Sequence, residues 1–374
     1  LGLSWQSSPA LTELEEVVTD WMRQMLGLSE AWSGVIQDTA STSTLVALLC
    51  ARERASNYSL ARGGLQREEH PLIVYASSHG HSSVEKAALL AGFGRDNLHF
   101  VGTDEEYAMR PEELEEAIRA DLRRGLVPCA VVATTGTTGT TALDPIEAIA
   151  ALASERDVSC HVDACMGGIT LPMLERLGEP VPPWDFRVDG VTSISVDLHK
   201  FGYAAKGASV IVHRTKDLRS YQTFFTDNWT GGAYGSSAVL GTKSVGPWAA
   251  AWAVMQYLGE DGYLRLTKQA RDATRRLVEA IRSEPGLVVR GEPEVTLVAF
   301  GSDDDGLDIY AVADALRQRG WYLDRQDPPP SLHATVNAVH AAVMDRFVED
   351  LAAAVGEVRS AGTHGDQAAY GTVE

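Results

Sequence analysis

Short runs of wholly apolar residues alternate with helical segments along most of the chain, and this alternation restricts the possible folds more than any other feature. The runs are rich in Val, Ile, Leu and Ala and lack the polar alternation of a half-exposed strand. Strands of this kind are buried on both faces, as in a mostly parallel α/β sheet covered by helices. The expected strands are 72–75, 98–101, 129–134, 159–162, 192–196 and 209–212, and the expected helices are 11–25, 41–54, 83–91, 111–124 and 145–154.

The beginning of the chain predicts a capped helix. Ser8-Pro9 places a polar residue and a proline where helices start, and Gly27 follows the last apolar position of helix 11–25. The chain opens at Leu1 in the middle of a pattern, so we expect a further N-terminal segment to precede it.

The pattern changes near residue 247. A long helical stretch is followed by strands and helices in no strict alternation, which predicts a smaller α+β domain. We therefore expect a large domain over 1–246, a small C-terminal domain over 247–374, and a loose tail from Ser360. The expected helices here are 248–283, 309–318 and 340–358, and the expected strands are 287–289, 295–300, 321–323 and 333–336.

The composition excludes several classes of protein. The 374 residues carry a formal net charge of −19, which would repel phosphate backbones and argues against a nucleic-acid partner. No apolar run reaches the roughly 18 residues of a membrane helix. The four cysteines are too few for a disulfide framework, and Cys160, His161 and Cys165 lack the second ligand pair of a metal site. Buried, reduced thiols and the lack of a signal peptide predict a cytoplasmic protein.

Reactive side chains follow several of the expected strands, at the end of a parallel sheet where ligands bind. Asp163 follows strand 159–162, Lys200 follows strand 192–196, and His81 follows strand 72–75. A run of Gly and Thr over 134–141 follows another strand. Each feature alone has an ordinary structural explanation, such as a turn cap, a surface charge or a packed imidazole. Their joint placement favours a cofactor site.

Pyridoxal phosphate (PLP) is a cofactor that requires this whole set. It takes a lysine for a Schiff base, and a carboxylate that keeps its pyridine nitrogen protonated. Its phosphate suits a helix N-terminus with small residues and hydroxyls, which Thr39-Ala40-Ser41 would supply. His81 would provide a flat ring against the cofactor.

These motifs resemble the group II PLP-dependent decarboxylases, which have the fold type I (aspartate aminotransferase-like) architecture. The first half is similar to aromatic amino acid decarboxylases, in segments such as 8–15, 34–37, 81–87 and 133–138. The second half is similar to sphingosine-1-phosphate lyases, in segments such as 161–168, 185–188, 197–200 and 228–232. His-Val-Asp-Ala at 161–164 with His-Lys at 199–200 is the most specific of these signals.

The resemblance implies a role for individual residues. Lys200 would form the Schiff base, Asp163 would pair with the pyridine nitrogen, and His81 would stack on the ring. A segment at Gly241-Thr242 would reach the phosphate of a neighbouring subunit, which implies a homodimer with composite sites. The other implied cofactor-binding residues are Ala40, Ser41, Thr138, Cys165, Asp197 and His199.

Two reactions remain open within this resemblance, because decarboxylation and Cα–Cβ cleavage begin alike. Lys206 lies where the lyases bind a substrate phosphate, and Asp197 replaces the asparagine of aromatic decarboxylases. Thr12, however, stands where the lyases carry a phosphate-binding histidine. Tyr221 and Tyr234 are candidates for the decarboxylases' catalytic loop tyrosine. We favour an L-amino-acid decarboxylase, with a lyase of phosphorylated amino alcohols as the alternative and a non-catalytic dimeric scaffold as a third.

Overall fold

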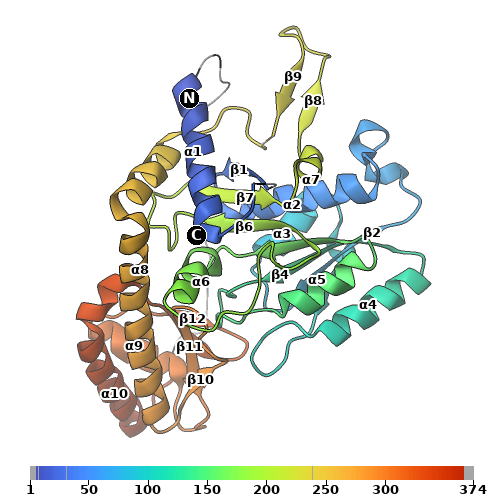
Figure 1. The fold of residues 1–374 in the computed structure, drawn as a ribbon. Coiled ribbons are helices and arrows are strands. Elements are labelled where there is room, and N and C mark those ends of the chain that lie inside the picture. The colour runs from blue at the N-terminus through green and yellow to red at the C-terminus, as the bar shows by residue number, and fades with distance from the viewer. Residues whose placement is uncertain (1–5, 7, 31, 238, 366–374) are drawn as a thin grey trace.

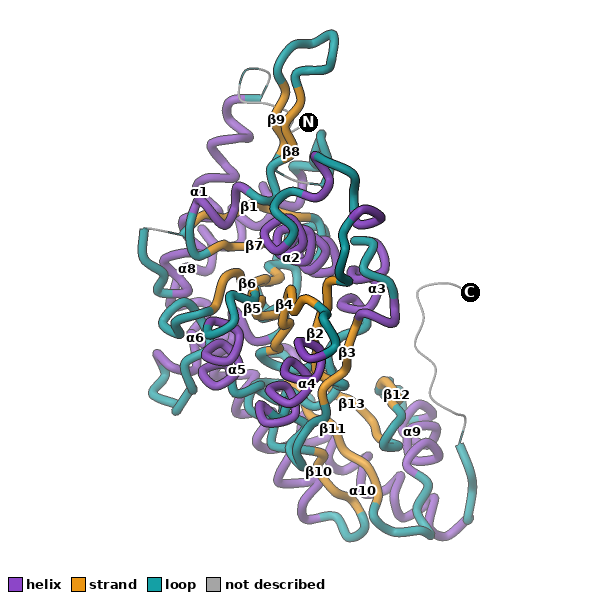
Figure 2. The backbone as a smooth tube through the Cα atoms, turned by 90° about the vertical axis from the view of Figure 1, so that its right-hand side faces the viewer, coloured by secondary structure: helices purple, strands orange, loops and turns teal. Residues whose placement is uncertain are grey.

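The computed structural model describes residues 6, 8–30, 32–237 and 239–365. Expectations for residues 1–5 and for the tail beyond 365 lie outside this part of the chain. The described residues form a large sheet with helices on both faces and a second, smaller sheet at one end of the molecule (Figure 1). A thin hairpin projects from the opposite end (Figure 2).

Seven of the described strands form the large sheet, in the order β1-β7-β6-β5-β4-β2-β3. Neighbours from β3 through β6 pair in parallel, whereas β7 is antiparallel to both β6 and β1. The mostly parallel α/β sheet expected from the sequence is therefore confirmed. Its strands are β1 Ser33–Gln37, β2 Leu72–Ser77, β3 Leu98–Val101, β4 Val127–Thr134, β5 Ser159–Asp163, β6 Val191–Asp197 and β7 Ser209–His213.

Both faces of the sheet are covered, which explains the wholly apolar strands. In β2, Ile73 and Tyr75 pack into the core on one face, and Val74 and Ala76 pack into the core on the other. The second face is covered by α2 Ala40–Ala55 and α3 Ser83–Leu90. The first face is covered by α1 Pro9–Leu26, α4 Pro111–Arg123, α5 Ile146–Ser154, α6 Gly167–Arg176 and the first part of α8 Gly246–Ser283.

The smaller sheet has its own apolar core. Its four strands are antiparallel in the order β10-β11-β13-β12, and α9, α10 and the second part of α8 pack on it. The predicted domain boundary at 246 falls at the start of α8, and this division stays a prediction. The elements are β10 Leu287–Arg290, β11 Leu297–Ser302, β12 Asp324–Gln326, β13 Ser331–Thr335, α9 Ile309–Gln318 and α10 Met344–Ala361.

Five differences from the sequence-based expectations stand out. The strand expected at 321–323 is wrong, because Trp321 instead bonds Asp350 and packs on Phe347 of α10, and pairing begins at 324. Strand β1 and helix α6 were not expected. Neither were the short α7 Lys216–Ser220 nor the hairpin of β8 Phe224–Thr226 and β9 Tyr234–Ser236.

None of the helices in the described ranges combines the length and the apolar character that crossing a bilayer requires. All four cysteines are free and buried, as expected from their apolar surroundings.

Candidate active site

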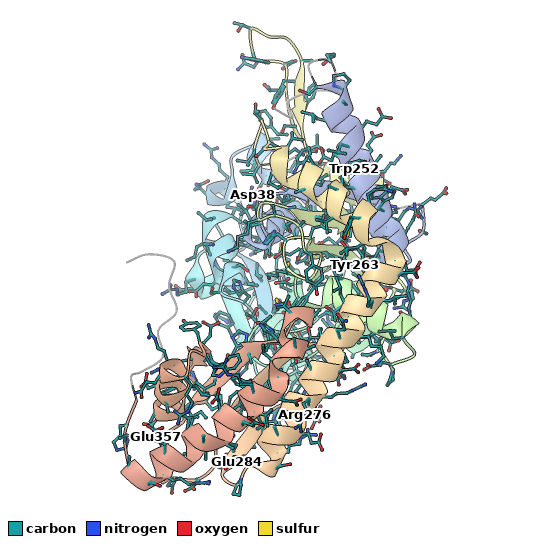
Figure 3. All side chains as sticks on the ribbon, turned by 90° about the vertical axis from the view of Figure 1, so that its left-hand side faces the viewer. Asp38, Trp252, Tyr263, Arg276, Glu284 and Glu357 are labelled. Carbon is teal, nitrogen blue, oxygen red and sulfur yellow. The ribbon has the colours of Figure 1, made fainter. Side chains whose placement is uncertain are left out.

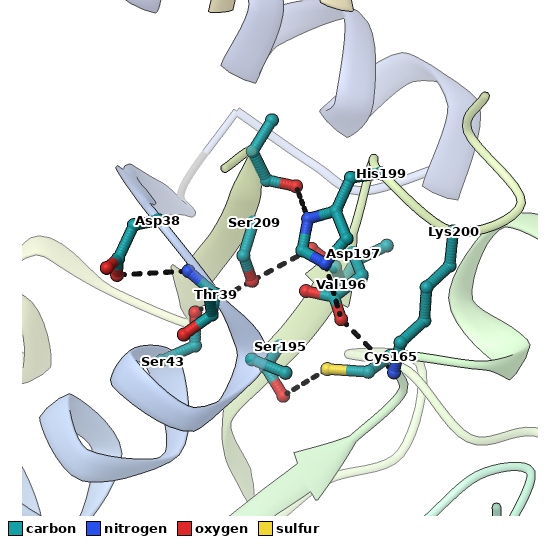
Figure 4. Close-up of polar contacts among 12 residues, drawn as sticks. Asp38, Thr39, Ser43, Cys165, Ser195, Val196, Asp197, His199, Lys200 and Ser209 are labelled. Carbon is teal, nitrogen blue, oxygen red and sulfur yellow. Dashed lines mark hydrogen bonds and ion pairs between the residues drawn. The ribbon is translucent and has the colours of Figure 1, made fainter. Parts of the chain in front are cut away.

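Lys200 lies in the tight turn that follows β6, and its side chain lies at the end of that strand. Its Nζ is 3.2 Å from Oδ2 of Asp197, the last residue of β6. Asp197 is 1% exposed, and the Nε2 of His199 lies 3.6 Å from the same oxygen. The strand end thus places a partly exposed amine over a buried carboxylate (Figure 4).

Asp163 ends the neighbouring strand β5 and is likewise buried. Its Oδ1 accepts the backbone N–H of Cys165 at 3.1 Å and the hydroxyl of Ser195 at 3.4 Å. Burial opposes the charge on Asp163, but hydrogen bonds from Cys165 and the positive charge of Lys200 outweigh it, and the pKa of Asp163 is lowered. Asp163 is therefore a carboxylate at neutral pH.

Two carboxylates also decide the charge of Lys200. Burial opposes the ammonium form, but negative charge on Cys165 in its thiolate form, on Asp197 and on Asp163 favours it, so the pKa of Lys200 is raised. Burial raises the pKa of the Cys165 thiol well above its usual value, so this sulfur is protonated at neutral pH. The carboxylates of Asp163 and Asp197 therefore supply the negative charge that Lys200 faces.

A buried polar network beneath these residues was not expected from the sequence. Ser195 of β6 contacts the Sγ of Cys165 at 3.4 Å and the Nε2 of His161 at 3.2 Å, and Nδ1 of His161 lies 2.9 Å from Ser193. Burial lowers the pKa of His161 to about 4, so its ring is neutral. The alternation Ser193, Ser195, Asp197 in a buried strand was the available signal, since such residues share one face.

His81 precedes α3 and is held by Ser83. Its Nδ1 accepts the backbone N–H of Ser83 at 3.1 Å and lies 2.8 Å from the Ser83 hydroxyl. Burial lowers the pKa of His81, and the charges of Asp163 and Lys200 act on it in opposite directions. A neutral ring near both charged groups is thus present where the sequence placed a flat cofactor neighbour.

The N-terminus of α2 lies beside the same cluster (Figure 4). Thr39 caps this helix by accepting the N–H of Thr42, and Ala40 and Ser41 form its first turn. The hydroxyl of Ser43 meets that of Ser209 at 3.0 Å and so joins α2 to β7. His199, which completes the cluster, donates its Nδ1–H to the carbonyl of Ala208 at 2.8 Å.

The remaining expected residues lie apart from this cluster of contacts. Thr138 is half-buried in the turn after β4. Gly241 and Thr242 are exposed in the segment between the hairpin and α8. Lys206 is exposed, whereas Lys243 is engaged by Glu15 at 2.7 Å and lies over the ring of Trp248. Of the lysines near the site, Lys200 faces the two buried carboxylates.

These residues fit PLP. Asp163 is an ionised, buried carboxylate at a strand end, as the protonated pyridine nitrogen requires. Among the described residues, neither oxygen of Asp197 has a well-formed hydrogen bond, and its Oδ2 lies 3.2 Å from Nζ of Lys200, so this buried carboxylate depends on a cationic partner. The first turn of α2 has free backbone N–H groups by its position in the helix, which suits a phosphate.

Comparison with known families agrees with this fit. Residues 1–302 match the family described as pyridoxal-dependent decarboxylase conserved domain. The chain belongs to this family. Its cofactor is accordingly PLP and its fold is fold type I, as the resemblance implied.

Individual members of the family are similar over nearly the whole chain. The chain is 33% identical to the sphingosine-1-phosphate lyase of Oryza sativa over 94% of its own length, but spans only 62% of that relative. The structure of the Burkholderia pseudomallei sphingosine-1-phosphate lyase has a TM-score of 0.86 at 34% identity, covering 96% of this chain and 80% of that one. The TDC of Oryza sativa, solved with PLP and tryptamine, has a TM-score of 0.80 at 26% identity, with 94% and 78% covered.

Proposed function

We propose that this member of the family is a PLP-dependent carbon–carbon lyase that cleaves the Cα–Cβ bond of a phosphorylated 2-amino alcohol. The observation that carries the lyase assignment is the cluster of Lys200, Asp197 and Asp163 at the ends of two neighbouring strands. The similarity to sphingosine-1-phosphate lyases over 94% of the chain supports the choice of bond.

In this proposal, Lys200 would hold the cofactor covalently through Nζ, and Asp163 would accept a hydrogen bond from its ring nitrogen. Ala40 and Ser41 would bind the phosphate at the start of α2, and His81 would lie against the ring. PLP, when bound, withdraws electrons from the substrate Cα, so that a bond to that carbon can break. Cys165, Asp197, His199 and Thr138 complete the predicted set of cofactor neighbours.

The chain's own groups handle the protons of the reaction. Asp163 keeps its negative charge at neutral pH because the N–H of Cys165 and the charge of Lys200 stabilise it. Asp197 lies 3.2 Å from Nζ of Lys200 and would keep this amine protonated, as a proton donor, whenever it is not bonded to the cofactor. In Cα–Cβ cleavage the β-hydroxyl loses a proton, an aldehyde leaves, and Cα gains a proton.

Decarboxylation of an L-amino acid is the second candidate, and it was the one that the sequence favoured. Thr12 supports it, because this position carries no histidine and its hydroxyl donates to the carbonyl of Ser8, the residue that precedes α1. The Gly and Thr turn at 134–141 resembles the decarboxylases as well. In this reaction the Cα–carboxylate bond breaks, carbon dioxide leaves, and Cα gains a proton.

A substrate panel separates the two reactions. The PLP-loaded protein is incubated with phosphorylated 2-amino-3-hydroxy compounds and, in parallel, with L-amino acids, while aldehyde and carbon dioxide are measured. We expect aldehyde from the phosphorylated compounds. Carbon dioxide from an amino acid without aldehyde from any amino alcohol would establish the decarboxylase instead.

Lys206 provides a test of the phosphate in the substrate. If Lys206 binds it, Lys206→Ala raises KM for a phosphorylated substrate about 10-fold or more, the size of one charged contact, and leaves kcat nearly unchanged. Lys216→Ala, at another exposed lysine, serves as the control. An equal KM in both variants would remove Lys206 from the substrate site.

Chemical labelling tests the covalent residue. Borohydride reduction of the PLP-loaded protein, followed by peptide mapping, is expected to label Lys200. Lys243 is the informative comparison, since Glu15 and the Trp248 ring already engage its ammonium. Label on Lys206 or Lys243 in place of Lys200 would overturn the assignment.

We also propose that the protein acts in the cytoplasm as a homodimer. The four free, buried thiols support a reducing compartment. The exposed segment at Gly241-Thr242, which has no role within its own subunit's cluster of contacts, supports a contribution to a second copy.

A further inference from the structure

The turn that carries Lys200 is closed tightly by its own backbone. The N–H of Tyr203 donates to the carbonyl of Lys200 at 3.1 Å, and the N–H of Ala204 donates to the carbonyl of Leu198 at 3.0 Å. A Cβ at Gly202 would meet the Leu198 oxygen at 2.4 Å, so the turn requires glycine there. Contacts that fix this turn therefore also fix the position of Lys200.

Two tyrosines connect the turn to the C-terminal part of the molecule. Tyr263 of α8 donates its hydroxyl to the carbonyl of Gly202 at 3.0 Å, and its side chain is 2% exposed. Burial raises the pKa of Tyr263, and the phenol of Tyr203 close by adds to the effect. Burial raises the pKa of Tyr203, and the nearby backbone N–H of Ala338, which begins the short 3₁₀ helix Ala338–Ala342 before α10, opposes this rise.

Tyr263 lies where α8 passes from one core to the other. The earlier residues Trp248 and Met255 pack on the large sheet, and the later residues Leu277 and Ile281 pack on the small one. Gly259, one turn before Tyr263, interrupts the helix with φ 57° and ψ −174°. Figure 3 shows Tyr263 midway along α8, beside the body of the large sheet.

From this connection we infer that Tyr263 is a positioning residue for Lys200. By holding the Gly202 carbonyl, it fixes the turn that carries the amine, and it couples that turn to α8 and the small sheet. A shift of the second part of α8 would thereby move Lys200 relative to Asp163 and Asp197. Only the role of Lys200 in this inference rests on the proposed function.

The test is Tyr263→Phe in the full chain, with Tyr257→Phe as the matched control on the same helix, since Tyr257 is 88% exposed. Without the phenol the Gly202 carbonyl loses its donor, and we expect the amides of 198–204 to exchange hydrogen about 10-fold faster before PLP is added. We also expect PLP to bind about 5-fold more weakly and the pH midpoint of its absorbance to shift. Tyr257→Phe should behave as the unmodified protein.

The outcomes separate this inference from the proposed function. Unchanged exchange of 198–204 and unchanged PLP affinity in Tyr263→Phe would refute the positioning role. Failure of the unmodified protein to bind PLP would refute the proposed function, yet the exchange measurement would still decide the coupling. If Tyr263→Phe does not fold, Tyr263→His tests the same contact with a ring too short to reach the Gly202 carbonyl, with faster exchange of 198–204 expected and unchanged exchange contradicting the positioning role.

Discussion

At the scale of single residues, Lys200 and its two carboxylates form a set of charges that one ammonium alone does not balance. The ammonium of Lys200 lies 3.2 Å from Asp197 and is also stabilised by the charge of Asp163. One positive charge therefore faces two negative charges, and the site without cofactor carries excess negative charge. Buried excess charge is costly unless a partner compensates for it. In the proposed function a protonated pyridine nitrogen against Asp163 would supply such a partner, which would account for two carboxylates in this interior.

Asp163→Asn tests this balance. The amide keeps the shape of the side chain but cannot stabilise a positive ring nitrogen, so we expect kcat to fall about 10²-fold or more while the covalent PLP is retained. Steady-state kinetics and absorbance spectra of the same samples measure both effects.

Asp121→Asn is the matched control for losing a buried carboxylate. Asp121 is 2% exposed and accepts the hydroxyl of Tyr75 at 2.8 Å, in a network outside the candidate site. We expect it to lower stability without changing kcat. Near-normal turnover in Asp163→Asn, or an equal loss in both variants, would contradict the role given to Asp163.

The sequence predicted those site residues whose chemistry is visible one residue at a time. Lys200 and Asp163 follow recognisable strands, so parallel pairing alone brings them to one edge. Ser195 could not be found that way, because its contacts with His161, Cys165 and Asp163 depend on the register of β5 against β6. The contacts of a serine in a strand cannot be predicted until the residues beside it on the neighbouring strand are known.

At the scale of elements, the helices and strands that the sequence did not predict are those that depend on contacts distant in the sequence. β1 is short, and its partner β7 lies far away in the sequence, so nothing local marked it. Helix α6 begins with two glycines and contains Pro172, which lowers its intrinsic helix propensity, and packing against the sheet overrides this. The run at 321–323 has strong strand propensity, yet Trp321 is anchored to α10 instead.

The interruption in α8 leads to a stability prediction. Gly259 adopts φ 57° and ψ −174°, a region that residues with a Cβ avoid, so Gly259→Ala is expected to cost about 1–3 kcal/mol. Gly356→Ala is the control, because Gly356 lies exposed within α10 without such a backbone and should gain about 0.5–1 kcal/mol. Denaturant unfolding measures both, and changes of the same sign would contradict the requirement for glycine at 259.

Two buried histidines make the large sheet sensitive to acid. Burial lowers the pKa of His161 on β5 and of His213 on β7 to about 4 each. Because both folded values lie below the ordinary value of about 6.5, the unfolded chain binds more protons as the pH falls. The stability they support is complete above pH 6.5 and is lost progressively toward pH 4.

Between pH 7 and pH 5 we expect each of these histidines to lower the free energy of unfolding by roughly 2 kcal/mol. Denaturant unfolding at both pH values measures the loss. His213→Gln should remove about half of the pH dependence, since its ring no longer titrates in the unfolded chain. Equal stability at pH 7 and pH 5 would show that the two rings are not held neutral.

The whole molecule exposes features that a single copy does not explain. The hairpin projects away from both sheets (Figures 1 and 2), and Phe224, Phe225 and Trp229 on it are 56%, 67% and 58% exposed. A cavity of about 810 Å³ opens beside it, lined by residues of the hairpin and α2 such as Phe225 and Leu49. Aromatic surface gathered in this way usually marks an interface.

The proposed homodimer, in which Gly241 and Thr242 would reach the partner's phosphate site, is open to a direct test. If each site needs both subunits, dilution of the PLP-loaded protein should release PLP over the same concentration range in which its mass halves. Thr242→Ala should weaken PLP binding about 3- to 10-fold without changing the dimer, because a hydroxyl contact to a dianion is lost. Thr363→Ala, at an exposed threonine, is the control. A stable monomer that keeps PLP with full affinity would rule out the composite site, since the phosphate would then depend on one subunit alone.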